Sequence, residues 1–198
     1  MIGLRAPLLC AAWVVSLVLR LCTAVEAKAQ QLEYLMVPSA AMARDIPVAF
    51  MAGGRHAVFL LDAFNAGSEV NNWTTAGGAA NTLAGKGISV VAPAGGAYSL
   101  YTDWEQDGSR QWETFLSSEL PNWLAANRGV SPSGNGIVGV AQGGTAALTM
   151  AAFHPEWFRY AGSMSGFLTP SATAMNGAIT AGLAEYGGNM WGPSQFGG

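Results

Sequence analysis

The 198-residue sequence has few of the side chains on which cross-links, metal sites and acid–base catalysis depend. It contains only two cysteines, Cys10 and Cys22, and two histidines, His56 and His154. Both cysteines lie close to the N-terminus, so the rest of the chain cannot form an internal disulfide bond and must rely on its hydrophobic core. The two histidines are far apart in the sequence and give no metal-ligand spacing. The sequence predicts neither a disulfide scaffold nor a metal centre.

Charged side chains are also scarce, at 11% of all residues. No basic stripe or cluster is present, which argues against nucleic acid as a partner. Asp103, Glu105 and Asp107 lie close together, but their spacing fits a calcium-binding EF-hand loop poorly. We therefore expect no metal ion and no cofactor.

The N-terminal segment has the three-part pattern of a secretory signal peptide. Arg5 precedes an apolar run at residues 7–19, and Ala27-Lys28-Ala29 follows as a cleavage site. The run is too short for a comfortable membrane span, although a membrane anchor or a buried helix is the alternative. We expect residues 1–29 to be removed and residues 30–198 to form one secreted, extracellular domain, free or associated with the cell wall. This mature chain has six basic and eleven acidic side chains, a net charge near −5.

Strand and helix patterns alternate along the rest of the chain, which predicts an α/β fold with a mainly parallel sheet and helices on both faces. Pro47 is expected to confine the second strand to a sheet edge. Pro121 should kink or divide the second helix, and Gly177 should interrupt the last one. The expected strands are at residues 32–37, 46–50, 57–61, 88–92, 137–140 and 160–164, and the expected helices at 74–84, 111–127, 145–153 and part of 172–186.

The most informative stretch runs from Gly136 to Leu148. A short apolar strand meets a glycine turn, and a helix-forming segment follows at once. This order is typical of the nucleophile elbow of α/β-hydrolases, whose pattern is Gly-x-Ser-x-Gly. The corresponding residues here are Gly139-Val140-Ala141-Gln142-Gly143, with Gly144 next. The glycines needed for close packing are present, but alanine has no lone pair with which to attack a carbonyl.

The remaining parts of a serine-hydrolase site are also incomplete. His56 is expected in a surface turn, and His154 is expected to cap the end of the helix that follows the elbow. Neither follows the elbow in the order acid, then histidine. Ser163 and Ser165 lie between glycines with the wrong spacing for an elbow, although either remains an alternative nucleophile. Only oxyanion donors are predicted, from the backbone N–H of Gln142 and from the loop after the strand at 57–61.

Several blocks of sequence resemble the mycobacterial antigen 85 mycolyltransferase family, and within it a secreted, fibronectin-binding member that lacks the catalytic serine. The resemblance covers nearly all of the chain after the signal segment, and the Trp-Glu-Thr-Phe-Leu…Glu-Leu-Pro block is its most specific part. The blocks are at residues 61–65, 87–93, 101–104, 112–121, 141–144 and 160–166.

The resemblance implies an α/β-hydrolase fold and acyl transfer between trehalose mycolates through a Ser-Glu-His triad. Ala141 takes the position of the serine. The oxyanion donors would be the backbone N–H groups of Phe64 and Gln142. Asp62 matches the sugar-binding aspartate of the family, but Asn65 replaces its arginine partner and cannot offer a bidentate cationic fork. The family also continues beyond residue 198, so we expect the last strands and both remaining triad residues to be missing.

Three hypotheses follow. The first is a secreted, non-catalytic member of the family that binds host matrix such as fibronectin, or small sugars. The second is an acyltransferase or esterase that acts on trehalose mycolates or related esters through another nucleophile. The third is a truncated remnant without function.

Overall fold

We analysed a computed structural model, which describes residues 31–105, 107–169 and 171–185. The expected signal peptide at 1–29 and the expected loop at 191–198 lie outside these residues. No helix within the described ranges is long and apolar enough to cross a membrane.

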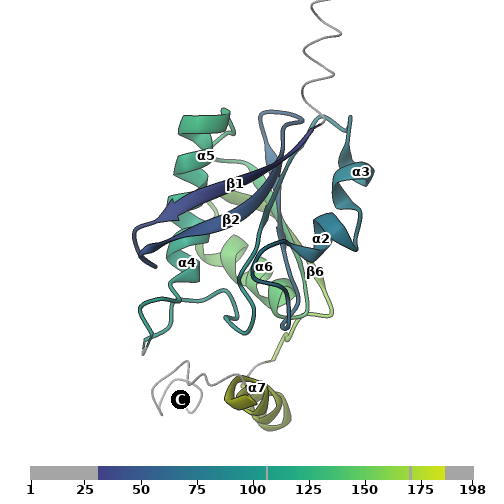
Figure 1. The fold of residues 1–198 in the computed structure, drawn as a ribbon. Coiled ribbons are helices and arrows are strands. Elements are labelled where there is room, and N and C mark those ends of the chain that lie inside the picture. Colours follow the sequence, from purple (N-terminus) through teal and green to yellow (C-terminus); the bar gives the residue numbers. More distant parts are fainter. Residues whose placement is uncertain (1–30, 106, 170, 186–198) are drawn as a thin grey trace, which may run out of the picture.

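A six-stranded mixed sheet runs through the centre of the described structure (Figure 1). The strand order is β1-β2-β4-β3-β5-β6. The pairs β1–β2 and β2–β4 are antiparallel, and the pairs β4–β3, β3–β5 and β5–β6 are parallel. The prediction of a mainly parallel sheet is therefore confirmed. The strands are β1 (Leu32–Ser39), β2 (Arg44–Met51), β3 (Ala57–Leu61), β4 (Ser89–Pro93), β5 (Asn135–Val140) and β6 (Phe158–Met164).

Helices pack against both faces of this sheet, as the sequence predicts. On one face, α4, η1, α5 and α6 cover the larger apolar cluster, which includes Phe59, Leu61 and Ile137. On the other face, α2 and α3 cover a smaller cluster around Leu60 and Val90. The helices are α2 (Asn72–Thr75), α3 (Ala79–Leu83), α4 (Trp112–Thr114), the π-helix η1 (Phe115–Glu119), α5 (Leu120–Arg128), α6 (Gln142–Phe153) and α7 (Thr173–Glu185).

The prediction that Pro47 confines its strand to a sheet edge is wrong. β2 lies between β1 and β4, and β1 is the edge strand. Pairing with β4 begins at Val48, which is opposite Pro93. Pro47 therefore lies just outside this ladder, where its missing N–H costs no hydrogen bond, and its carbonyl accepts one from the Ala94 N–H at 2.8 Å.

The amphipathic helix expected at 111–127 is present and is divided, as Pro121 predicts. A proline cannot donate to the carbonyl four residues earlier, and its ring crowds that carbonyl. The chain accommodates this with the π-helix η1, in which the Leu120 N–H bonds to the Phe115 carbonyl five residues back. Trp112, Phe115 and Leu124 are buried on the inner face of the composite helix.

Two predicted helices differ from the structure because of glycines. The helix expected at 74–84 is two short helices, α2 and α3, because Gly78 adopts φ 59° between them. The expected interruption of the last helix at Gly177 is absent, and α7 continues through that residue. Gly177 is exposed and lies near no other atoms, and a single glycine costs a helix only about 1 kcal/mol.

Candidate functional site

Residues 139–144 form the strand–turn–helix that the glycine pattern predicts. Ala141 lies between β5 and α6 with φ 51° and ψ −117°. This backbone conformation is unfavourable for a residue with a Cβ atom and is the strained geometry that presents a nucleophile at an elbow. Two hydrogen bonds hold it, from the Ala141 N–H to the Met164 carbonyl at 2.9 Å and from the Thr145 N–H to the Ala141 carbonyl at 3.1 Å.

The glycines around Ala141 are required by close backbone contacts. A Cβ atom on Gly139 would lie 2.1 Å from the Gly143 carbonyl carbon. A Cβ atom on Gly143 would lie 2.5 Å from the Leu61 carbonyl oxygen, and one on Gly144 would lie 2.9 Å from Ser163 Oγ. The helix therefore starts directly against β3 and β6, which places its first N–H groups where β3 and β5 end.

The side chain of Gln142 joins three segments beneath the elbow. It is fully buried. Its Nε2 donates to the carbonyls of Ala63 at 3.0 Å and Gly96 at 2.8 Å, and its Oε1 accepts from the Leu100 N–H at 3.0 Å. The loop after β3, which contains the expected oxyanion donor Phe64, is thereby tied to the elbow. Sequence reasoning identified only the backbone N–H of Gln142, because nothing in a single sequence indicates which carbonyls a glutamine will reach.

The loop after β4 is also held in a strained conformation beside the elbow. Tyr98, Leu100 and Tyr101 all have φ between 52° and 55°. Tyr101 is buried, and its hydroxyl accepts a hydrogen bond from the Asp62 N–H at 3.0 Å. Burial, with the nearby charge of Asp62, raises the pKa of Tyr101 far above its usual value, so the phenol stays neutral. Strain of this kind persists only where the surrounding contacts determine the backbone.

The two residues that the resemblance assigns to sugar binding differ in burial. Asp62 is 2% exposed, and its Oδ2 accepts from the Asn72 N–H at 2.8 Å. Burial raises the pKa of Asp62, although the N–H groups of Asn72 and Trp73 oppose this shift. Asn65 is exposed, and no described hydrogen bond joins it to Asp62. The two residues form no pair in this structure.

A hollow of about 360 Å³ lies at the ends of β5 and β6, beside Asp62. Val140 and Met164 line it, together with Trp73, whose ring is fixed by a 2.9 Å hydrogen bond from its Nε1 to the Leu61 carbonyl. An aromatic ring beside a carboxyl group and a few apolar side chains is a common composition for a small-molecule site. Trp73 is a lining residue that the sequence did not predict.

Neither histidine is near the elbow residue in a catalytic arrangement. His56 Nδ1 lies 3.1 Å from the Ser133 carbonyl on an exposed turn, as predicted. His154 follows α6, at the opposite end of that helix from Ala141, and its backbone N–H closes the helix on Met150. Its Nε2 lies 2.9 Å from Glu113. The chain therefore offers no described imidazole to act as base at position 141.

The two alternative serines lie in different environments. Ser163 Oγ is buried between Gly144 and Gly166, and it is a buried side-chain oxygen without a hydrogen-bond partner among the described residues. A hydroxyl enclosed in this way cannot reach a substrate. Ser165 is exposed with φ 52°, and both histidines make their recorded hydrogen bonds elsewhere.

Two of the acidic residues in the 103–107 segment, Asp103 and Asp107, accept hydrogen bonds from nearby backbone and hydroxyl groups. Asp103 accepts from the N–H and hydroxyl groups of Thr114 at 3.0 and 2.6 Å. Asp107 accepts from the N–H and hydroxyl groups of Ser109. No cluster of three potential metal ligands occurs in the described part of the chain.

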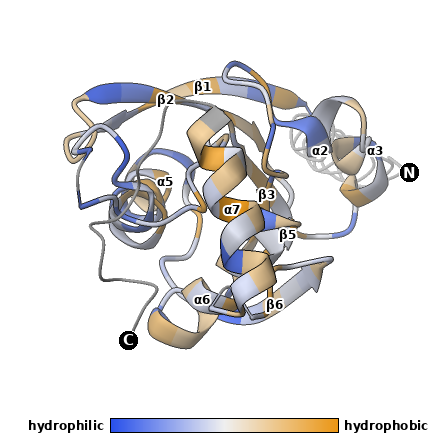
Figure 2. Ribbon diagram, turned by 90° about the horizontal axis from the view of Figure 1, so that it is seen from below, coloured by the Kyte–Doolittle hydropathy of each residue, from blue (hydrophilic) through white to orange (hydrophobic). Residues whose placement is uncertain are grey.

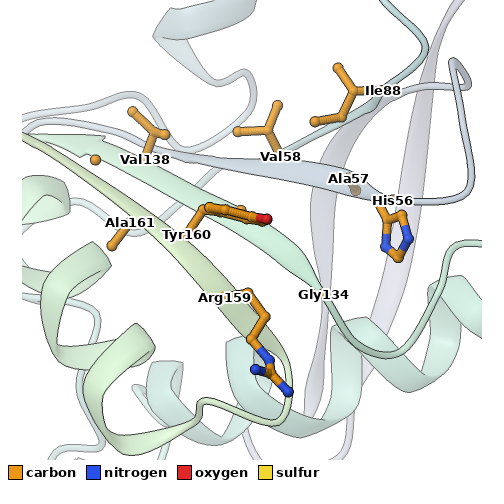
Figure 3. Close-up of a pocket in the computed structure, with 11 residues that line it drawn as sticks. His56, Ala57, Val58, Ile88, Gly134, Val138, Arg159, Tyr160 and Ala161 are labelled. Carbon is orange, nitrogen blue, oxygen red and sulfur yellow. The ribbon is translucent and has the colours of Figure 1, made fainter.

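A second hollow, of about 550 Å³, lies on the face of the sheet formed by β3, β5 and β6 (Figure 3). Val58, Val138 and Tyr160 line it, with His56 and Arg159 at one end. The Tyr160 side chain is 73% exposed. Helices α2 and α3 cover the neighbouring part of this face, so the surface beside β6 is open within the described residues.

The fold and the elbow define the class of protein. The sheet, the helices on both faces and the strained strand–turn–helix at Ala141 are those of an α/β-hydrolase. In agreement, a family model described as "Putative esterase" matches residues 39–197, and the chain belongs to this esterase family. An S-formylglutathione hydrolase from Agrobacterium tumefaciens, 18% identical, has the same fold with a TM-score of 0.65 over 83% of this chain and 65% of its own.

Within this family the chain is most informatively compared with mycobacterial antigens. The MPT51/MPB51 antigen of Mycobacterium tuberculosis (strain ATCC 25618 / H37Rv) is 64% identical over 98% of this chain and 68% of its own length. The crystal structure of M. tuberculosis MPT51 (FbpC1) is 68% identical and has a TM-score of 0.81, covering 84% of this chain and 64% of that one. A diacylglycerol acyltransferase/mycolyltransferase, Ag85B of Mycolicibacterium smegmatis, is 47% identical over 82% of this chain and 54% of its own length. The resemblance to the antigen 85 family is confirmed.

Proposed function

We propose that the protein is a secreted, non-catalytic member of the antigen 85 family that binds a small carbohydrate, or host matrix such as fibronectin. The observation that carries the proposal is Ala141, which has the backbone conformation of an elbow nucleophile without a nucleophilic atom. The glycine contacts and the Gln142 hydrogen bonds maintain the surrounding architecture. A preserved scaffold without a nucleophile supports binding rather than acyl transfer.

The hollow beside Asp62 is the binding site that we propose for a sugar. The Asp62 carboxyl group would accept hydrogen bonds from sugar hydroxyls, and the half-buried ring of Trp73 would pack against the apolar face of the sugar. The oxyanion donors Phe64 and Gln142 would bind a polar group of the ligand without reacting. Isothermal titration calorimetry with glucose and trehalose tests this site. Asp62→Ala should weaken binding about tenfold, whereas Asn65→Ala, at an exposed position outside the hollow, should not.

Immobilised fibronectin tests the protein-binding form of the proposal. Saturable binding that free trehalose does not displace would place fibronectin on a different surface from the sugar. Failure to bind fibronectin, glucose and trehalose would contradict the proposed function and favour a remnant, a conclusion that the absence of a cooperative thermal transition would strengthen.

Catalysis is tested with p-nitrophenyl esters. We expect no turnover by the unmodified chain, and none by Ala141→Ser, because a serine without a base remains a weak nucleophile; loss of the base can lower kcat by about 10⁶-fold in a serine hydrolase. Ester turnover blocked by a serine-directed inhibitor would contradict this expectation.

The alternative is acyl transfer or ester hydrolysis through Ser163 or Ser165. It predicts activity in the unmodified chain that Ser165→Ala or Ser163→Ala abolishes. The exposed hydroxyl of Ser165 is the more accessible of the two. If neither variant changes a measured activity, this alternative is wrong.

A further inference from the structure

A polar cleft of about 260 Å³ lies against the start of the loop after β4, at Gly95 and Ala97. Arg44, from the first residue of β2, and Arg110, from the segment before α4, both line it. Gly95, Ala97 and Ser109 are the other described residues of the lining. The described lining shares no residue with that of the hollow beside Asp62. Two arginines that are distant in the sequence therefore line one separate site.

Both guanidinium groups lie over tryptophan rings. The Arg110 Cζ atom lies 4.3 Å from the centre of the Trp104 ring, and the Arg44 Cζ atom lies 5.9 Å from the centre of the Trp112 ring. Both rings are buried and therefore rigid. Stacking of this kind limits the motion of the guanidinium plane and leaves its N–H donors at the edge free to meet a ligand.

Arg110 is only partly neutralised by its ion pair. Its Nε lies 3.1 Å from Asp107 Oδ2. Asp107 also accepts from the Ser109 N–H and hydroxyl groups at 2.9 and 2.6 Å. These hydrogen bonds, with the charge of Arg110, hold the pKa of Asp107 below its usual value, so it stays ionised. The recorded ion pair involves only Nε of Arg110, so the N–H groups on its two terminal nitrogens remain available to a ligand.

Arg44 has no ion-pair partner among the described residues. Its recorded polar contact is a long one, from Nη2 to Met42 Sδ at 3.9 Å. The carboxylate of Glu119, which lies near the start of β2, is occupied by the Ser39 hydroxyl and the Ala41 N–H. Among the described residues, the two guanidinium groups have one recorded carboxylate partner, that of Asp107, so the described part of the cleft carries a net positive charge in a chain whose net charge is −3.

We propose that this cleft binds a tetrahedral oxyanion, a phosphate or sulfate group that is free or esterified to a small sugar. The planar donors of arginine match phosphate and sulfate oxygens, and two such forks give both charge and direction. The cleft is slightly smaller than the ~300–1,000 Å³ of sites for larger ligands, which favours a single anionic group. This site is independent of the proposed function at the elbow.

Calorimetric titration of the full chain at low ionic strength tests the proposal, with inorganic phosphate, inorganic sulfate, glucose 6-phosphate and glucose as probes. We expect saturable binding of at least one anion and none of glucose at this site. Arg44→Gln and Arg110→Gln should each weaken anion binding about tenfold, the usual cost of losing one charged hydrogen-bonding partner. Binding of glucose 6-phosphate that is tighter than that of inorganic phosphate, and that Arg44→Gln and Arg110→Gln weaken but Asp62→Ala does not, would identify an esterified group as the ligand. Equal binding of the two would identify the free ion.

Arg128→Gln is the matched control. Arg128 also lies over a tryptophan, with its Cζ atom 5.6 Å from the centre of the Trp123 ring, and it is paired with Glu33 at 3.1 Å. The substitution removes the same charge, but Arg128 lies outside the cleft, so anion affinity should be unchanged. Equal weakening by Arg128→Gln would show that only the overall charge matters, and absence of saturable anion binding would overturn the proposal. Circular dichroism and the Tm of each variant verify that it is folded.

Discussion

At the scale of single residues, the backbone of Ala141 has the conformation of an elbow nucleophile, but its side chain has no nucleophilic atom. A non-glycine residue at φ 51° and ψ −117° costs about 1–3 kcal/mol. In an active hydrolase this strain presents a nucleophile, but here it presents a methyl group. The strain persists because the contacts of Gly139, Gly143 and Gly144 leave no other path for the chain.

The first prediction concerns this strain. Ala141→Gly should raise the free energy of unfolding by about 1 kcal/mol, because glycine adopts positive φ without a steric penalty, which outweighs its greater freedom in the unfolded chain. Urea unfolding measures the change. Ala146→Gly, within α6, is the control and should lower stability by about 1 kcal/mol or more. A destabilised Ala141→Gly would mean that the alanine methyl group makes a stabilising contact.

The second prediction concerns the buried carboxyl group of Asp62. Because its pKa is raised in the folded state, the folded protein binds a proton there more readily than the unfolded chain. Stability from this group is therefore fully present below its unfolded pKa of 3.8 and is lost as the pH rises through the folded pKa. Asp62→Asn, whose carbonyl can still accept from Asn72, should be more stable than the unmodified protein at pH 7, with a difference that disappears below about pH 4.

Urea unfolding between pH 3 and pH 7 measures whether the stability difference between Asp62→Asn and the unmodified protein grows as the pH rises. Asp107→Asn provides the opposite case, because the pKa of Asp107 is lowered in the folded state. Its stabilising contribution is present above pH 3.8 and is lost as the pH falls through the folded pKa. The Asp107 side chain is 39% exposed, so the effect should be small. The same pH dependence for both variants would contradict the assignment for Asp62.

At the scale of elements, one side chain connects loops that the sheet alone would leave separate. Gln142 is the first residue of α6, yet its amide bonds to the segment after β3 and to the loop after β4. The second of these loops contains three non-glycine residues with positive φ. We infer that the amide of Gln142 helps to hold this strained loop against the elbow.

The third prediction tests this connection. Gln142→Met keeps the size of the side chain but leaves the Ala63 carbonyl and the Leu100 N–H without their recorded partner. The Gly96 carbonyl keeps its hydrogen bonds from the N–H and hydroxyl groups of Ser99. Because buried polar groups without partners cost about 1–3 kcal/mol each, the variant should lose about 2 kcal/mol or more of stability. Thermal and urea unfolding measure it. Thr149→Ala, on the exposed side of the same helix, should change stability by less than about 0.5 kcal/mol; an equal loss would show that α6 is sensitive to any substitution.

At the scale of the whole molecule, the two faces of the sheet differ. Helices α4 to α6 bury the larger cluster on one face, while α2 and α3 cover only part of the other. Figure 2 shows α7 lying across the ends of β3 and β5, where Ile179 and Leu183 pack with Trp104 near the elbow. The open apolar surface is therefore at β6, and its described lining shares no residue with that of either proposed binding site (Figure 3).

The fourth prediction concerns this open surface. The full chain should bind an apolar fluorescent dye such as anilinonaphthalene sulfonate, and Tyr160→Lys should reduce the fluorescence by about half because it places a charge in the hollow beside β6. Phe153→Lys is a closely matched control. Phe153 is 72% exposed, against 73% for Tyr160, but it lies at the end of α6 and outside the hollow. A larger effect of Phe153→Lys would assign the dye to another surface.

The sequence by itself determined most features that depend on neighbours along the chain, although the break at Gly78 and the unbroken helix at Gly177 were not predicted. All six strands, the division near Pro121 and the elbow at Ala141 follow from apolar runs, proline chemistry and glycine spacing, which are local properties. The substitution at the nucleophile position is likewise visible without coordinates. Only the tertiary structure decided what depends on distance in space: that Pro47 lies in an inner strand just beyond its ladder with β4, that the amide of Gln142 reaches two loops, and that Arg44 and Arg110 share a cleft. Sheet order and side-chain reach bring these groups together, and neither is a periodic property of the sequence.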